Sequence, residues 1–497
     1  MSRNRRAGVL LHPTSLPGVC GIGTLGRHLR AFLEFLSHSG FSLWQVLPLT
    51  PPAAGNSPYS AYSAFAGNHL LIDLEQLVAD GDLPADRLHG VDFPKDRVDF
   101  ERLIPWKEAL LREAAESFFA NAAQERQAEF RQFCDRTYWL HDYALFRALK
   151  RHYRERPWTR WPVDIARRKP EALECAFQRL GPEINSEKYR QWQFFRQWEQ
   201  VRGWASELNI KIVGDLPIFV AHDSADVWCN REQFLLDGRG KPLVVAGVPP
   251  DYFSDTGQLW GNPLYDWQVM EERGFDWWIA RIRQMIALFD LVRIDHFRGF
   301  AAAWQVQAKE CTAKNGCWAP GPGSRFFEAV QNAIGGLPFI AEDLGVITPD
   351  VEALREQFKL PGMKILQFAF DSDAQNPYLP HNHDQDAVVY TGTHDNDTTS
   401  GWLASVSSDV RQRIGTYLGK EGAATTEDLI RMALMSVADT AIIPLQDLFA
   451  LSTEARMNRP GVALGNWEWR FGSELPASGG LSAITAQLGL YGRLNNS

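Results

Sequence analysis

The sequence predicts an α/β protein built on an eight-stranded (β/α)8 TIM barrel, with inserted subdomains at the carboxyl-terminal face of the barrel and no C-terminal β-sandwich. The first observation is a series of short, nearly continuous apolar runs, which are typical of parallel strands covered on both faces. The second is their number and their alternation with helical patterns, because eight such strands form this barrel. The runs are residues 7–13, 43–49, 210–217, 291–297, 338–344, 363–370, 387–395 and 440–447.

The unequal spacing of the runs predicts where the barrel is interrupted. Runs five to seven begin about 25 residues apart, which is normal for one strand and one helix. About 160 residues separate runs two and three, and their amphipathic patterns predict a mainly helical insertion over 60–205. Between runs three and four we expect a smaller insertion over 218–275, with a hairpin turning at Asp237-Gly238 and an active-site loop. Because only about 50 residues follow run eight, we treat 1–497 as a single barrel domain.

Capping residues predict the starts of two helices. Thr348 precedes Pro349 and Asp350, a combination that suits an N-cap, the first helical position and the positive end of the helix dipole. Thr426 stands in a similar position before a second apolar helical pattern. The first of these helices would follow the fifth run, and the second would precede the eighth.

Composition and charge exclude several classes of protein. The 51 basic and 60 acidic residues give a formal net charge of −9, which does not suit sequence-independent binding to nucleic acid. No apolar run approaches the ~18 residues of a membrane span, and the run 7–11 is too short for a signal peptide. The six cysteines form no CxxC pair, so we expect free thiols and a cytoplasmic location.

The 18 tryptophans leave two interpretations open. Indole rings fill cores and the contacts between subdomains. Their flat faces also suit the apolar C–H faces of sugar rings. Composition alone does not decide between packing and sugar binding.

Polar side chains interrupt the apolar runs where four of the strands are expected to end. A barrel of this kind carries its active site at the carboxyl ends of its strands, so these side chains would share one cleft. Arg293 and Asp295 are two residues apart and point to the same side of their strand. The arginine would keep the carboxylate ionised, as a nucleophile requires, although an ion pair that only stabilises the barrel fits this pair equally well. The side chains are those of Asp215, Arg293, Asp295, His296, Glu342, Asp343, His394 and Asp395.

Three carboxylates converge on this rim from three different strands. Taken singly, Glu342 also fits a cap or an ion-pair partner, His394 a satisfied polar contact and Asp395 part of a turn. The convergence of Glu342 and Asp395 with Asp295 favours chemistry instead. Glycoside cleavage needs a pair of carboxyl groups, which lie ~5–5.5 Å apart in retaining enzymes.

Eight segments of the sequence are specific when taken together and in this order. They are LHPTSLPG (11–18), NSPYSAYSAFAGN (56–68), GDLPIFVAHDS (214–224), GVPPDYFSDTGQLWGNP (247–263), RIDHFRG (293–299), AEDLG (341–345), GTHDND (392–397) and GNWEWR (465–470). From about residue 10 to residue 470, the chain resembles the 4-α-glucanotransferases, or amylomaltases, of the α-amylase clan. The resemblance implies retaining cleavage of α-1,4-glucosidic bonds and transfer of the glucan chain to the 4-OH of an acceptor glucose or maltooligosaccharide.

The resemblance also implies roles for individual residues. Asp295 matches the nucleophile, Glu342 the general acid/base, and Asp395 the third carboxylate, which holds and distorts the sugar at the cleavage point. Burial beside other carboxylates would raise the pKa of Glu342, as an acid requires. The other matching residues are expected to bind substrate, and they are Ser57, Tyr59, Asp215, Gln258, Trp260, Arg293, His296, His394 and Asn466.

Maltooligosaccharide and amylose substrates, and no cofactor, are implied as well. In many α-amylases the motif after the third strand continues into a calcium-ligating asparagine and then a histidine, but Phe219 and Val220 stand at the aligned positions. We therefore expect no metal. Two other functions stay open, namely a hydrolase of the same clan that shares the three carboxylates, and a barrel that only binds glucan. Chain-length preference and oligomeric state are undetermined by the sequence.

The segment 247–263 is expected to form a mobile lid at the barrel mouth. It combines possible glycine hinges with Tyr252, Phe253 and Trp260 as a surface for sugar rings. A lid that closes over an acceptor sugar would exclude water and favour transfer over hydrolysis. A surface loop whose aromatic rings only pack on the barrel is the alternative.

Overall fold

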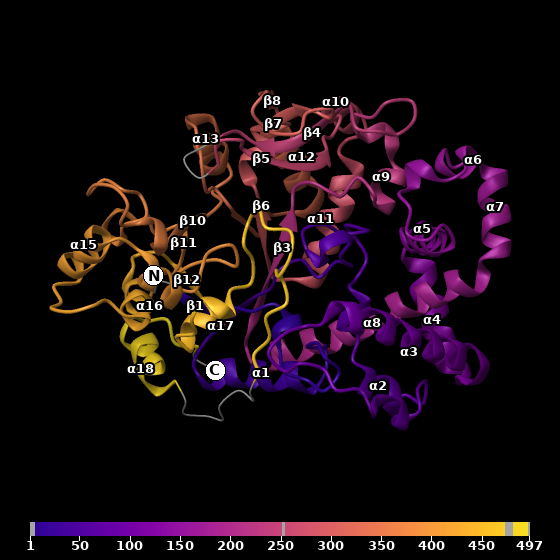
Figure 1. Ribbon diagram of the computed structural model, residues 1–497, viewed down its shortest axis with the longest axis horizontal. Coiled ribbons are helices and arrows are strands. Elements are labelled where there is room, and N and C mark those ends of the chain that lie inside the picture. Colours follow the sequence, from indigo (N-terminus) through magenta and orange to yellow (C-terminus); the bar gives the residue numbers. More distant parts are fainter. Residues whose placement is uncertain (1–4, 251–253, 473–480, 496–497) are drawn as a thin grey trace.

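Eight parallel strands close into a barrel (Figure 1). The computed structural model describes residues 5–250, 254–472 and 481–495. The barrel strands are β1 (Arg6–Leu10), β2 (Leu43–Gln45), β3 (Lys211–Pro217), β6 (Leu291–Asp295), β9 (Phe339–Ala341), β10 (Gly362–Ile365), β11 (Ala387–Tyr390) and β12 (Thr440–Pro444). They follow one another round the barrel in chain order, and β12 closes onto β1. Each strand overlaps one predicted apolar run, so the predicted barrel is confirmed.

The interior of the barrel changes from apolar to charged toward its carboxyl end. One buried cluster holds a residue from each of seven strands, namely Leu10, Leu43, Val213, Ile340, Met363, Val388 and Ile442. Strand β6 adds the partly buried Leu291 to this cluster. Because side chains alternate along a strand, Leu291, Arg293 and Asp295 point to the same side of β6. The apolar layer therefore gives way to charge where β6 leaves the packed interior.

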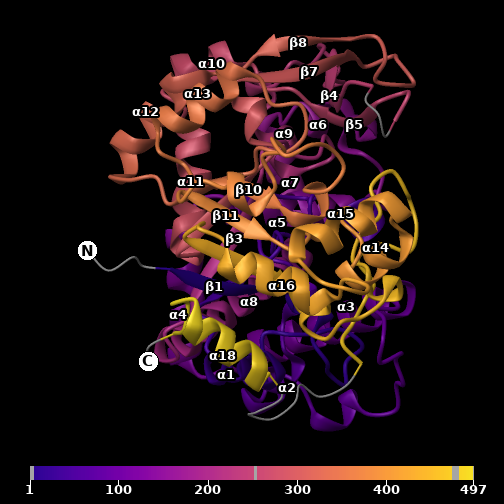
Figure 2. The same ribbon diagram turned by 90° about the vertical axis from the view of Figure 1, so that its left-hand side faces the viewer.

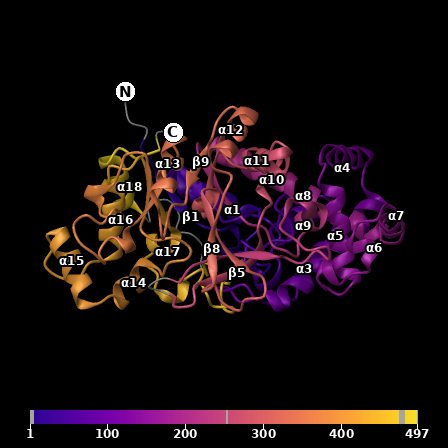
Figure 3. The same ribbon diagram turned by 90° about the horizontal axis from the view of Figure 1, so that it is seen from above.

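The helices between β2 and β3 gather on one side of the barrel (Figures 1 and 3). They are α2 (Leu74–Ala79), α3 (Phe100–Asn121), α4 (Gln124–Arg136), α5 (Leu140–His152), α6 (Val163–Ala166), α7 (Pro170–Arg179) and α8 (Gly181–Glu207). The far end of α8 packs on the barrel, because the Trp198 ring lies 6.0 Å from that of Trp44 and its indole N–H donates to the carbonyl oxygen of Leu288 at 3.2 Å. Helix α8 is thus shared between the helical insertion and the barrel.

The remaining helices cover the barrel and its loops. They are α1 (Arg27–His38), α9 (Ala225–Cys229), α10 (Trp267–Glu272), α11 (Asp276–Leu288), α12 (Gly323–Ile334), α13 (Pro349–Gln357), α14 (Thr399–Ser405), α15 (Ser408–Leu418), α16 (Thr426–Met435), α17 (Leu445–Leu448) and α18 (Ser482–Leu490). Beyond β12 the described residues form helices and no strand. None of the described helices is long and apolar enough to span a membrane.

The two predicted helix starts have different outcomes. Helix α13 begins at Pro349 with Thr348 in the N-cap position, as expected. Helix α16 is capped one residue earlier than expected, by Thr425. The Thr425 hydroxyl accepts the N–H of Asp428 while the Asp428 carboxylate accepts the N–H of Thr425. This capping box satisfies two backbone donors at once, which Thr426 does not offer.

A four-stranded antiparallel sheet lies above the barrel in both side views (Figures 1 and 2). Its strands are β4 (Val244–Val248), β5 (Gln258–Pro263), β7 (Ala302–Gln307) and β8 (Gly316–Pro320), in the order β5-β4-β7-β8. The predicted turn at Asp237-Gly238 is present as a short bridge between Leu236 and Pro242. Strand β4, which follows this turn, pairs with β5 and β7. The expected simple hairpin is therefore part of a larger sheet. Strands β7 and β8 follow β6, outside the insertion predicted over 218–275.

Candidate active site

The register between β3 and β6 brings three predicted site residues together. Asp215 pairs with Arg293, and one guanidinium nitrogen of Arg293 lies 2.8 and 2.7 Å from the two carboxylate oxygens of Asp215. The other terminal nitrogen lies 3.0 Å from Oδ1 of Asp295. The side chains of Asp215 and Arg293 are 0% and 5% exposed, whereas that of Asp295 is 28% exposed. Asp295 is therefore the member of this network that a substrate can reach.

Glu342 follows β9 and is held by the turn that carries Asp295. Its Oε2 accepts the backbone N–H of His296 at 2.7 Å, and its Oε1 accepts that of Leu344 at 3.1 Å. His296 adopts a left-handed backbone conformation with φ 52° and ψ 51°, which is uncommon outside glycine and is typical of functional sites. This turn directs the His296 N–H to Glu342, so it couples the positions of the two carboxyl groups.

Burial raises the pKa of both Asp295 and Glu342, although part of the Asp295 side chain faces solvent. Arg293 lowers both values, while Asp215 and Asp395 raise that of Asp295. Arg293 acts on Asp295 in the expected direction, because it lowers the pKa, but burial opposes this effect and is the larger cause. Because the two carboxyl groups meet at the His296 turn, they titrate together.

Asp395 projects from the loop after β11 and is fixed by a segment that follows β12. Its side chain is 47% exposed, and its Oδ1 accepts a hydrogen bond from Nδ2 of Asn458 at 2.6 Å. The Arg456 guanidinium donates to the backbone carbonyls of Asp395 at 2.6 Å and of Asn458 at 2.7 Å. Sequence reasoning did not find Arg456 and Asn458. They lie about 60 residues from Asp395 and outside any strand end, so no spacing signal indicated them.

Tyr59 and His394 form a stacked pair beside the carboxylates. Their ring centroids lie 5.1 Å apart at an interplanar angle of 13°. The Tyr59 hydroxyl donates to Oδ2 of Asp215 at 2.7 Å, and Ser57 Oγ accepts the Tyr59 N–H at 3.3 Å. Burial lowers the pKa of His394 and raises that of Tyr59, so both rings are neutral near pH 7. The pair offers a rigid, uncharged surface.

Trp260 and Gln258 lie on β5, opposite His296. The indole N–H of Trp260 donates to Oε1 of Gln258 at 3.2 Å, and the Trp260 ring lies 4.8 Å from that of His296 in an edge-to-face arrangement. Burial lowers the pKa of His296 to about 3, so this ring is neutral. The second half of the expected lid is therefore a paired strand rather than a loop. The predictions for Tyr252 and Phe253 lie outside the described residues.

The remaining predicted positions are Asn466 and the two residues that align with a calcium site in many α-amylases, Phe219 and Val220. The side chain of Asn466 donates to the carbonyls of Arg459 and Val462, and thereby closes its own loop rather than bonding to the carboxylates. Phe219 and Val220 are buried and apolar. Within the described part of the chain, no group of three or more His, Cys, Asp or Glu side chains is arranged to hold a metal ion.

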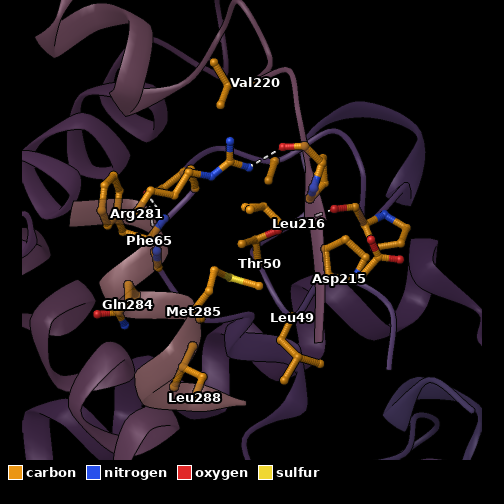
Figure 4. A pocket seen from close by; sticks show the side chains of 18 of the residues that line it. Leu49, Thr50, Phe65, Asp215, Leu216, Val220, Arg281, Gln284, Met285 and Leu288 are labelled. Atoms are coloured by element: carbon orange, nitrogen blue, oxygen red, sulfur yellow. Dashed lines mark hydrogen bonds between the residues drawn. The ribbon is translucent and has the colours of Figure 1, made fainter. Parts of the chain in front are cut away.

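A small pocket lies behind Asp215 (Figure 4). Its lining is mostly apolar and includes Leu216 and Met285. Arg281 crosses it and donates to the carbonyl of Pro217 at 2.6 Å. Tyr59 and Asp215 also line it, so the pocket adjoins the predicted substrate-binding residues from the side of β3.

Comparison with known proteins identifies the family. A family model described as 4-alpha-glucanotransferase matches residues 11–474. The 4-alpha-glucanotransferases of Thermus thermophilus and of a Synechocystis species are each 50% identical to this chain, over 95% and 99% of both sequences respectively. An amylomaltase from Streptococcus agalactiae, solved in complex with acarbose, matches with a TM-score of 0.96 at 37% identity over 99% of this chain and 100% of that chain. The protein is an enzyme acting on α-1,4-glucans, and the chain belongs to the 4-alpha-glucanotransferase family.

Proposed function

We propose that this enzyme transfers α-1,4-glucan chains by a retaining double displacement through a glycosyl ester on Asp295. The observation that carries the proposal is the coupling of Asp295 to Glu342 through the His296 N–H, which donates to Glu342 at 2.7 Å. The two carboxyl groups meet at the His296 turn, and burial raises the pKa of both. A pair with one nucleophilic and one acidic member is what retaining cleavage requires.

In the first half-reaction, Glu342 gives its proton to the glycosidic oxygen while the ionised Asp295 attacks the anomeric carbon. The bond from that carbon to the leaving oxygen breaks, and the released chain departs with a free 4-OH. In the second half-reaction, the ionised Glu342 takes the proton of an acceptor 4-OH, whose oxygen attacks the same carbon and releases Asp295. Two inversions leave the α-configuration unchanged.

The remaining carboxylate is proposed to bind the sugar at the cleavage point. Asp395 is exposed, and the hydrogen bond from Asn458 to its Oδ1 holds the side chain in one orientation. Its fixed charge can interact with the hydroxyl groups of a distorted ring and with the positive charge that develops at the anomeric carbon. The stacked pair of Tyr59 and His394 would bear one face of the same ring.

The other predicted residues are proposed to support or surround the three carboxylates. Arg293 and Asp215 support Asp295 from the barrel interior, and Trp260 with Gln258 forms one wall for the acceptor sugar. His296 separates that wall from Glu342. Ser57 and Asn466 shape the loops of which they are part.

Maltooligosaccharides and amylose are the proposed substrates, and a cytoplasmic location is proposed because the described structure leaves all six cysteines as free thiols.

Incubation with pure maltotriose tests the reaction type. Transfer produces glucose together with a ladder of longer chains, whereas a hydrolase of the same clan produces only shorter sugars. Asp295→Asn is the control, because the amide preserves shape but cannot form the ester. Unchanged maltotriose, with the wild-type protein folded, would contradict the proposal.

A further inference from the structure

The structure separates the 18 tryptophans into packed and exposed rings. Among the described residues only Trp260 and Trp318 are exposed, each at 39%. Both lie on the four-stranded sheet above the barrel, on its two edge strands β5 and β8 (Figure 1). Trp260 already has a proposed partner, the acceptor sugar. Trp318 has none, although exposing a large indole to water is unfavourable.

The Trp318 ring is supported on one face only. The guanidinium carbon of Arg298 lies 3.7 Å from the centroid of the Trp318 ring, directly over it. The Trp304 ring meets Trp318 edge to face at 5.2 Å, and its own indole N–H is anchored to the carbonyl of Ala313 at 2.8 Å. Because Arg298 covers one face and Trp304 borders the ring, the exposed area lies mainly on the other face. Trp318 is thus a flat apolar surface that is held in place before any ligand arrives.

Trp318 lies outside the cleft that Trp260 borders. Across the sheet, Trp318 pairs with Trp304, Trp304 with Gly247, and Gly247 with Leu259. Directly paired residues share one face of a sheet, and successive residues alternate between faces. The β4–β5 pairing shifts register just after Leu259, at Trp260, and the Trp260 ring meets that of His296. Trp318 and Trp260 therefore lie on opposite edges of one sheet, separated by the inner strands β4 and β7.

Trp318 is nevertheless connected to the turn that follows Asp295. Arg298, which supports Trp318, stands three residues after Asp295 and donates to the carbonyl of Val346, in the loop that follows Glu342. Trp318 therefore lies beside the turn that follows Asp295, on the edge of the sheet opposite Trp260.

We propose that Trp318 is a second glucan-binding platform, which stacks on a glucose unit of a long α-1,4-glucan at a distance from the bond that is cleaved. The ring faces of such a glucan are apolar and uncharged, which matches the flat, partly exposed indole of Trp318. A long chain that is held both in the cleft and on Trp318 gains affinity from the second contact. A trisaccharide is too short to use both places. This inference rests on the proposed use of amylose as a substrate.

Steady-state kinetics of Trp318→Ala on two substrates tests the platform. The KM for amylose should rise at least threefold with little change in kcat, and the KM for maltotriose should change less than twofold. Trp318→Phe keeps a flat ring and should recover most of the amylose affinity. Tyr138→Ala is the matched control, because Tyr138 is 68% exposed on the helical insertion, and it should leave both values unchanged. Wild-type turnover of maltotriose tests the proposed function separately.

Two outcomes would overturn the proposal. An unchanged KM for amylose would show that Trp318 is only a surface residue, and equal losses on amylose and maltotriose would show that it only supports the catalytic turn. If Trp318→Ala does not fold, as judged by circular dichroism, Trp318→Gln takes its place. Mobility in native gels that contain amylose gives an independent measurement. The inactive Asp295→Asn protein should be retarded, and addition of the Trp318 substitution should reduce the retardation.

Discussion

The side-chain amide of Asn458 donates a hydrogen bond of 2.6 Å to Oδ1 of Asp395, from a segment about 60 residues further along the chain. Arg456 bonds to the backbone carbonyls of both residues, so the two form one unit. Asp395 is exposed, and a free aspartate at such a site would sample several rotamers. The contact with Asn458 removes that freedom before substrate binds, which lowers the cost of reaching the transition state.

We expect Asn458→Ala to lower kcat/KM for maltotriose by about 10–100-fold. A hydrogen bond to a charged group contributes roughly 1.5–3 kcal/mol, and ~1.4 kcal/mol corresponds to a factor of ten in rate. The fall should appear mainly in kcat, because Asp395 is proposed to act most strongly on the distorted ring. Asn315→Ala, which changes an exposed asparagine in the loop between β7 and β8, is the control. Wild-type kcat in Asn458→Ala would remove Asn458 as a positioning residue.

The pH dependence of kcat/KM should be bell-shaped, with both limbs above the ordinary carboxyl pKa values, because burial raises the pKa of Asp295 and that of Glu342. On the acid limb Asp295 gains a proton and loses its nucleophilicity, and on the alkaline limb Glu342 loses the proton that it must donate. The two limbs report the free enzyme and belong to the coupled pair. Initial rates at low maltotriose concentration measure the profile. An optimum near pH 5, with an acid limb near the ordinary aspartate pKa of ~3.9, would contradict the raised pKa of Asp295.

Glu342→Gln should lose at least the ~10²–10⁴-fold that general acid catalysis contributes when maltotriose is the donor. The side chain keeps its shape, and its Oε1 can still accept a backbone N–H. With an α-maltotriosyl fluoride donor the first step should fall much less, because fluoride leaves without a proton. Release of fluoride ion and release of glucose measure the two cases. Equal losses at the first step would remove Glu342 as the acid.

Trp260→Ala should lower the ratio of transfer to hydrolysis more than it lowers total bond cleavage. The ring forms the acceptor wall beside His296, and loss of ~1.4 kcal/mol of acceptor binding shifts the partition tenfold. Glucose and total reducing ends released from maltotriose measure both quantities. Tyr138→Ala is the control, because this exposed ring lies on the helical insertion. A constant ratio with reduced cleavage would make Trp260 a binding or packing residue only.

The barrel and its three carboxylates could be predicted because they follow from local rules. Parallel strands buried on both faces leave continuous apolar runs, and the alternation of side chains places Arg293 and Asp295 on one side of β6. The end of a barrel strand is also where charge is tolerated. Asp215, Asp295 and Glu342 all stand at such ends, so each left a signal in its own segment.

Features that depend on contacts between distant segments left no such signal. Asn458 reaches Asp395 only because the chain after β12 folds back over the loop after β11. Strands β7 and β8 contain AAWQVQ and GCWAP, and they are stabilised by pairing, β7 with β4 and β8 with β7, rather than by an apolar run of their own. The raised pKa of Asp295 left no signal in its own segment either, because its largest cause is burial in the folded barrel mouth, while Arg293 lowers that pKa as expected.

Mass spectrometry of a trapped intermediate tests the central claim most directly. In Glu342→Gln, α-maltotriosyl fluoride can still react with Asp295, but no base remains to activate an acceptor, so the glycosyl ester should accumulate. After quenching in acid and digestion with pepsin, a peptide that contains Asp295 should carry the mass of one maltotriosyl group, and Asp295→Asn/Glu342→Gln should carry none. An adduct on Asp395 or on any other residue, or its persistence in the double variant, would contradict the assignment of Asp295 as the nucleophile.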